Sequence, residues 1–283
     1  MKPRATIVVL LLVAGACTHG TSGWLLREDA ENVNADGGDA GGAGGETSVP
    51  GAGASGEAGA ASEPLRCPSR FANNCSPSIS FQNLDTGPSG QLFGEAIPDL
   101  PTTLTCITRD VCNTLYRKTS EIKTITQISV IVENYDGISE TYGSNGQATI
   151  HMSSSYMQQV VDSGGNLSDE LHGIFYYHGT NIYQFDGGDG TTNAWVVQGV
   201  ADFVRYSAGF LPANQRMPGG NYNDGFTTTG FFFAWLDPIY PDFVYELNQS
   251  LNPAVTTMWT TQAFSDITGQ TVDELWANYQ TTL

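Results

Sequence analysis

The chain has 283 residues, of which 29 are Asp or Glu and 11 are Lys or Arg, so its formal net charge is −18 at pH 7. From residue 66 onward, acidic residues outnumber basic ones 21 to 8. This charge argues against nucleic acid and anionic lipid surfaces as partners, because both would repel the chain.

Residues 1–17 are predicted to form a signal peptide. Lys2 and Arg4 precede an apolar run that ends in small residues and is too short to span a bilayer as a stable helix. Cleavage before Cys17 would resemble the processing of a bacterial lipoprotein, in which the cysteine is acylated. We therefore expect an exported chain anchored by lipid to the outer membrane or cell surface. The alternative is an ordinary secreted protein, since Ala14 stands where such signals usually carry Leu.

Residues 18–65 are rich in Gly, Ala, Ser and acidic residues. Such a composition cannot bury enough apolar surface to offset the entropy lost on ordering, so it predicts a disordered tether. Behind a lipidated cysteine, the tether would hold a folded domain away from the membrane. The membrane would then be contacted only through the lipid anchor.

The next segment, 66–103, is rich in Pro, Asn and Gly and is predicted to be an irregular lead-in to a domain over 104–283. An even number of cysteines in an exported chain favours two disulfides. Of the three possible pairings, sequence neighbours are the simplest. Zinc binding by these cysteines is the alternative, disfavoured because no C-x-x-C pair is present. The four cysteines are Cys67, Cys75, Cys106 and Cys112.

Alternating β-branched residues predict strands over 125–132 and 147–152, with a loop or short strand between them. Acidic residues after Ser168 mark the start of a helix over 169–184. Thr271 and Glu274 form a capping box before the last helix. The other predicted helices are 104–118, 153–161, 194–207, 224–236, 240–250, 255–266 and 271–281.

Residues 173–184 read Gly-Ile-Phe-Tyr-Tyr-His-Gly-Thr-Asn-Ile-Tyr-Gln. This segment resembles G-V-L-Y-H-E-M-T-H-V-W-Q of the plant basic secretory protein family, a group of secreted zincin-type metallopeptidases of plants and bacteria. Further matches in the same order are Glu-Leu-Asn within 243–248 and Thr-Val-Asp-Glu-Leu-Trp within 268–279. The resemblance covers about 104–283. It implies an α+β, zincin-like domain with a small sheet followed by a mainly helical C-terminal half.

The family's H-E-x-x-H motif works because two His side chains four residues apart reach one zinc, while the Glu deprotonates the metal-bound water. Aligned without a gap, these positions hold Tyr177, His178 and Asn181, and the position implied for the third ligand holds Gln198. Neutral phenol and amide groups are poor zinc ligands. A one-residue slip that aligns His178 with the first His also destroys the motif. The sequence therefore predicts no zinc and no peptide hydrolysis by the usual route.

The resemblance also implies a cleft along the helix over 169–184. In zincins, the strand before this helix forms the sheet edge beside which substrate lies, so 147–152 is expected to border the cleft. A replacement metal site would need His151 on that strand to approach His178 or Asp202; the favoured interpretation is that His178 is a polar residue in the cleft and binds no metal. We expect the cleft to be lined by Tyr177, His178, Asn181, Trp195, Gln198, Asp202 and Phe226.

Three functions remain open from the sequence. The leading hypothesis is a non-catalytic, exported homologue of a zinc metallopeptidase, whose cleft binds an extracellular peptide or glycan at the cell surface. The second is a metal-dependent peptidase with non-standard ligands, such as His178, His151 and an acidic residue. The third is a structural surface lipoprotein whose cleft is filled by its own side chains.

Overall fold

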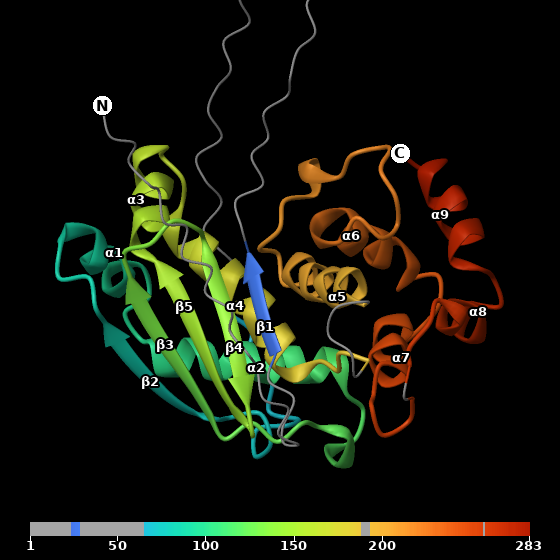
Figure 1. Cartoon of the computed structure of the whole chain (residues 1–283), viewed down its shortest axis with the longest axis horizontal. Coiled ribbons are helices and arrows are strands. Elements are labelled where there is room, and N and C mark those ends of the chain that lie inside the picture. Colours follow the sequence, from blue (N-terminus) through green and yellow to red (C-terminus); the bar gives the residue numbers. More distant parts are fainter. Residues whose placement is uncertain (1–23, 29–64, 188–192, 257) are drawn as a thin grey trace, which may run out of the picture.

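A computed structural model describes residues 24–28, 65–187, 193–256 and 258–283. The predicted signal peptide, with Cys17, and most of the predicted tether lie outside the described residues. The described part is a mostly helical α+β fold with one small mixed sheet (Figure 1). Its strands are β1 (Trp24–Glu28), β2 (Ser78–Asn83), β3 (Gln127–Glu133), β4 (Ser139–Ser144) and β5 (Gln147–Ser153). Its helices are α1 (Pro88–Ala96), α2 (Leu100–Leu115), α3 (Ser154–Asp162), α4 (Leu167–Tyr183), α5 (Ala194–Ser207), α6 (Phe226–Leu236), α7 (Phe243–Ser250), α8 (Gln262–Thr268) and α9 (Val272–Gln280).

The sheet has the strand order β1-β4-β5-β3-β2. Strands β2, β3 and β5 are parallel, whereas β4 runs antiparallel to both β5 and β1. Side chains on successive strand residues point to opposite faces, so the alternation in β3 and β5 buries one face of the sheet. The buried apolar residues on these two strands are Ile128, Val130, Val132, Ala148, Ile150 and Met152.

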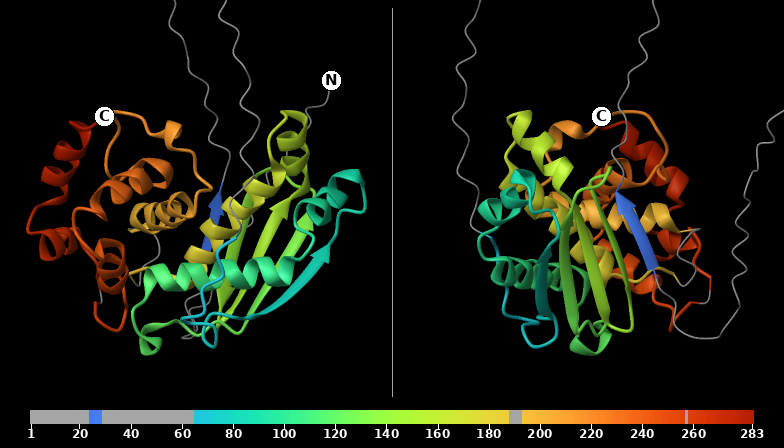
Figure 2. Two further views of the ribbon diagram at one scale, coloured as in Figure 1. Left: turned by 180° about the vertical axis from the view of Figure 1, so that it is seen from behind. Right: turned by 60° about the vertical axis from the view of Figure 1, so that its left-hand side comes forward.

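Helices α2 and α4 lie across the buried face of the sheet (Figure 2), and they pack against each other. Helices α5 to α9 form a helical half beside the β1 and β4 side of the sheet (Figure 1). A buried cluster of apolar residues continues through both halves. Within the helical half, α5 and α6 approach closely because Gly199 and Gly230 carry no side chain where the helices meet.

The N-terminal part of the domain is more regular than predicted. Residues 66–103 were expected to be irregular, but they contain β2, α1 and the start of α2. Pro88 occupies the first turn of α1, where a missing N–H costs nothing. The Asp99 side chain accepts a hydrogen bond from the Thr102 N–H and caps α2, which therefore begins at Leu100 rather than at 104.

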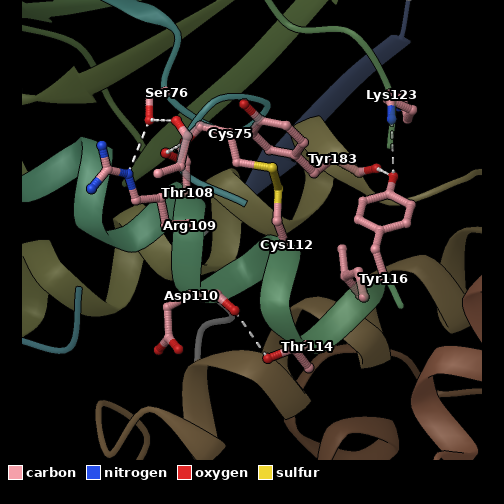
Figure 3. The surroundings of a disulfide bond; sticks show 12 residues. Cys75, Ser76, Thr108, Arg109, Asp110, Cys112, Thr114, Tyr116, Lys123 and Tyr183 are labelled. Atoms are coloured by element: carbon pink, nitrogen blue, oxygen red, sulfur yellow. Dashed lines mark hydrogen bonds between the residues drawn. A yellow bond between two sulfur atoms is a disulfide. The ribbon is translucent and has the colours of Figure 1, made fainter. Parts of the chain in front are cut away.

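Two disulfides attach this lead-in to α2, as an even number of cysteines indicated. The expected neighbour pairing is wrong, however, because the bonds join Cys67 to Cys106 and Cys75 to Cys112. Figure 3 shows the second disulfide beside Thr108, whose hydroxyl donates a hydrogen bond to the Cys75 carbonyl at 2.9 Å. Each disulfide therefore joins two segments that are distant in the chain.

Three further differences concern the sheet and one helix. Strand β5 lies inside the sheet, between β4 and β3, so 147–152 is not an edge. Residues 24–28, which were assigned to the tether, form β1 and pair with β4. The helix expected over 255–266 begins only at Gln262. Among the described residues, none of the helices combines the length and the apolar character needed to cross a membrane.

Candidate functional site

Helix α4 holds the residues that align with the family's zinc motif. It begins after Asn166, whose side chain accepts hydrogen bonds from the Ser168 and Asp169 N–H groups, with acidic residues in its first turn. From Gly173 to Tyr183 every residue of the helix is buried. It is enclosed by α2, α5 and β4, so its motif positions contact protein rather than solvent.

His178 stands at the position of the general base and is fully buried. Its Nε2 atom and the Ser139 hydroxyl on β4 form a hydrogen bond of 2.7 Å. Its Nδ1 atom has no hydrogen-bond partner among the described residues. Burial, and then the positive charge of Arg205, lower the pKa of His178 to about 3. The imidazole is therefore neutral at pH 7 and is a weak base.

Tyr177 stands at the position of the first zinc-binding His and is only 1% exposed. Its ring is stacked on that of Phe226 at the start of α6, with the ring centres 6.3 Å apart. Phe226 has a φ of 43° and follows Gly225 at a φ of 79°. A bulky residue in the left-handed region is strained, so packing against Tyr177 contributes to holding this conformation.

Asn181 stands at the position of the second zinc-binding His and is also buried. Its side-chain carbonyl accepts a hydrogen bond of 2.7 Å from Gln184, whose amide also donates to the Val197 carbonyl at 3.0 Å. Gln198, at the position of the third ligand, is partly exposed, and its Oε1 atom lies against the backbone at Gly225. The amides of Asn181 and Gln198 thus contact neighbouring parts of their own protein.

Asp202 lies one turn after Gln198 on α5 and is buried near Arg205, with 3.8 Å between its Oδ1 and the guanidinium. The same guanidinium lies 3.5 Å from Glu170 of α4, and its Nε donates a hydrogen bond to the Phe210 carbonyl. Asp202 therefore takes part in an ionic network that ties α5 to α4.

The expected cleft is only partly present. Four of its seven residues are buried, namely Tyr177, His178, Asn181 and Asp202. The other three, Trp195, Gln198 and Phe226, are partly exposed. Trp195 packs in the aromatic cluster of the helical half, stacked on Phe264 with ring centres 6.1 Å apart. The positions that would face a metal in an active relative are thus filled by packed side chains.

The described residues form no alternative metal site around His151. The His151 ring contacts Glu133 and Tyr142 on neighbouring strands, with 2.6 Å between its Nε2 and the Tyr142 hydroxyl. It lies on the outer face of the sheet, whereas His178 bonds Ser139 on the buried face. The sheet separates the two imidazoles, so the alternative in which His151 approaches His178 does not agree with the structure. In 24–28, 65–187, 193–256 and 258–283, no three His, Cys, Asp or Glu residues are arranged to hold a metal ion.

Two residues that contact the motif positions were not predicted as site residues. Ser139 forms a hydrogen bond with His178, and Gln184 donates one to Asn181. Gln184 was recognised only as a match to the family's final motif residue. Ser139 lies in a polar stretch without apolar alternation, so no local signal placed it on a strand beside α4.

A groove of about 790 Å³ lies away from the motif positions, between α7 and α8. It was not anticipated from the sequence. Its lining includes Tyr240, Glu246, Met258, Trp259, Asp266 and Ile267.

Comparison with known proteins agrees with the resemblance seen in the sequence. The family model described as "Peptidase of plants and bacteria" (BSP) matches residues 76–279, most of the chain. No curated protein and no solved structure matches the chain. The family match begins before residue 104, so β2, α1 and the start of α2 belong to the shared domain. The chain is a member of the BSP family of plant and bacterial peptidases.

Proposed function

We propose that this chain is a non-catalytic, exported member of its family, which keeps a zincin-like scaffold without the zinc. The observation that carries the proposal is the environment of His178. At the position of the general base, the chain has a fully buried, neutral imidazole that is hydrogen-bonded to Ser139. A group that no water can reach does not activate a metal-bound water.

The donor chemistry supports the same proposal. Zinc in proteins is bound by imidazole, thiolate or carboxylate groups. The aligned positions offer the phenol of Tyr177 and the neutral amides of Asn181 and Gln198. A phenol ligates only after losing a proton whose ordinary pKa is about 10. These residues do not fit zinc.

The arrangement of α4 beside β4 and α5 supports a zincin-like assignment, because the family's two ligand helices are neighbours here. On this scaffold we propose recognition of an extended peptide at the cell surface, and a glycan is the other ligand class that an extracellular site of this kind would take. The predicted signal peptide and Cys17 are the basis for export and lipid anchoring. The excess of acidic residues argues against nucleic acid as a ligand.

A structural surface protein is the second candidate function. The observation that favours it is the packing of Tyr177 on Phe226, which fills the motif region with the chain's own side chains. A metal-dependent peptidase with non-standard ligands has less support, since His151 and His178 lie on opposite faces of the sheet.

Cleavage of casein by residues 18–283 tests the absence of catalysis. The protein is assayed with Zn²⁺, Mn²⁺, Co²⁺ or Ca²⁺ and with a chelator, alongside His178→Ala and the control His172→Ala on the same helix. We expect no chelator-sensitive cleavage by any of the three proteins. Cleavage that requires metal, persists in His172→Ala and disappears in His178→Ala would overturn the proposal.

A further inference from the structure

Three side chains on the outer face of the sheet form a chain of hydrogen bonds that crosses three strands. The phenol oxygen of Tyr142 on β4 and the Nε2 atom of His151 on β5 lie 2.6 Å apart. Through its Nδ1 atom, the same imidazole bonds the carboxylate of Glu133 on β3. Strand β5 lies between β4 and β3, so the pairing of the strands brings the imidazole between the phenol and the carboxylate.

The order of these groups fixes the direction of both hydrogen bonds. An ionised carboxylate can only accept, so the Nδ1 atom of the neutral imidazole carries the proton that bonds Glu133. The lone pair then lies on Nε2 of His151, and the Tyr142 hydroxyl donates to it. A hydroxyl, an imidazole that can take its proton and a carboxylate that orients the imidazole are the three parts of an activated nucleophile.

The phenol of this chain is open to a reactant. Tyr142 is 38% exposed, whereas the other eleven tyrosines, all of them within the described residues, are buried or partly buried. The side chain of His151 is 14% exposed. Figure 1 views the sheet from its outer face, with α2 and α4 behind the strands. The nucleophile is therefore accessible, while its base is sheltered beside it.

We propose that Tyr142 is a nucleophile that accepts the acyl group of small carboxylic esters with a good leaving group. His151 is its general base, and Glu133 is the positioning residue that orients the imidazole. The proposal goes beyond the function proposed above, because it needs no metal and the site lies on the opposite face of the sheet from His178. Glu140 lies opposite His151 in the pairing of β4 with β5 and adds a second carboxylate, so the ester is neutral or cationic.

The reaction has two steps in which atoms and protons balance. In the first, the Tyr142 oxygen attacks the carbonyl carbon of the ester while its proton passes to Nε2 of His151. The bond from this carbon to the leaving oxygen breaks, and His151 gives the proton to the departing alcohol. In the second, His151 takes a proton from water, the water oxygen attacks the acyl-tyrosine, and the released phenolate recovers that proton. The products are the carboxylic acid, the alcohol and unchanged Tyr142.

Acetylation by p-nitrophenyl acetate tests the nucleophile and its base. Residues 18–283 and the variant His151→Gln are treated briefly with the ester, and mass spectrometry measures acetyl transfer to each tyrosine. Tyr245 is the internal control, because its hydroxyl donates to a carboxylate, that of Glu121, rather than to an imidazole. General-base catalysis contributes about 10²–10⁴-fold, so we expect the rate at Tyr142 to fall at least about tenfold in His151→Gln, with the rate at Tyr245 unchanged. An unchanged rate at Tyr142, or an equal loss at both tyrosines, would overturn the proposal.

Release of p-nitrophenol tests whether the acyl group passes through Tyr142. We expect a burst of about one p-nitrophenol per chain and then a slower steady release, as an acylated intermediate requires. Tyr142→Phe should lose the burst, whereas the matched control Tyr245→Phe should keep it. A chelator should change neither phase. The absence of a burst in the unchanged chain, or a full burst in Tyr142→Phe, would contradict the proposal.

The role of Glu133 has a spectroscopic signature that is independent of the reaction rate. Nitrogen NMR in alkaline solution, where the imidazole is neutral, shows which ring nitrogen of His151 carries the proton. We expect the proton on Nδ1 in the unchanged chain and a shift toward Nε2 in Glu133→Ala, together with slower acetylation of Tyr142. A proton on Nε2 in the unchanged chain would overturn the proposal, since this nitrogen could then not accept the proton of Tyr142.

Discussion

The buried imidazole of His178 makes the stability of the domain depend on pH in a way that one substitution should remove. The pKa of His178 is about 3 in the folded protein, against an ordinary value of 6.5, because burial and the charge of Arg205 oppose protonation. Above pH 6.5 the group is neutral in both states, and below pH 3 it is protonated in both. Between these values the unfolded chain binds a proton that the folded chain excludes. The stability conferred by the neutral imidazole is therefore present above pH 6.5 and is lost as the pH falls toward 3.

The size of this effect follows from the two pKa values. A pKa of about 3 in the folded protein against 6.5 in the unfolded chain corresponds to about 5 kcal/mol in the free energy of unfolding. About 2 kcal/mol of this stability is lost between pH 7 and pH 5. His178→Gln removes the titrating group and keeps an amide that can hydrogen-bond Ser139. We therefore expect the free energy of unfolding of the unchanged protein to fall by about 2 kcal/mol more than that of His178→Gln over this range.

Urea denaturation at pH 7 and pH 5, followed by tryptophan fluorescence, measures this difference. The control His172→Gln changes a partly buried histidine on the same helix and should retain the full loss of the unchanged protein. Other groups that titrate in this range contribute equally to all three proteins and cancel in the comparison. Equal pH dependence in the unchanged protein and His178→Gln would contradict the burial of His178, because it would mean that water reaches the imidazole.

Two further predictions concern packing and covalent links, and both are measured as free energies of unfolding at pH 7. Gly179→Ala should stabilise the protein by about 0.5–1 kcal/mol, since alanine favours helix and the nearest atom to the added methyl is 3.6 Å away. Gly199→Ala should destabilise it by about 1–3 kcal/mol through overpacking, since the methyl would lie 2.3 Å from Thr229 Cγ2; equal effects of the two substitutions would contradict the close contact of α5 and α6. Cys75→Ala/Cys112→Ala should cost about 3 kcal/mol, because with Cys67–Cys106 kept this bond closes a path of only about 15 residues through 67–75 and 106–112. A loss below about 1 kcal/mol would show that this link constrains the unfolded chain little.

The helices with clear periodicity could be predicted from the sequence. The ranges expected for α4 and α5 agree with the structure to within two residues, and the capping box of Thr271 and Glu274 is confirmed at the start of α9. Family membership was also recognisable from several motifs in the same order, and the family match confirms it. These features depend on local patterns, which a single sequence displays directly.

Features that depend on distant parts of the chain were missed. Strand β2 alternates only two apolar residues, Ile79 and Phe81, with polar ones, which is a short signal inside a segment rich in Pro, Asn and Gly. Strand β4 has a polar sequence without apolar alternation. The pairing of cysteines is fixed by the position of the lead-in over α2 and not by spacing. The burial of His178 depends on Ser139, which lies 39 residues away in the chain. A polar residue such as His178 is ordinarily expected to be exposed, and its burial is visible only in the packed structure.

Elemental analysis of residues 18–283 shows directly whether the motif region binds zinc. The protein is purified without chelator or added metal, and its zinc content is measured against protein concentration. We predict far less than one zinc ion per chain, with no change after incubation in zinc and removal of the excess. One zinc ion per chain that is lost in Tyr177→Phe/Asn181→Ala would contradict this prediction, because it would place the metal at these two positions.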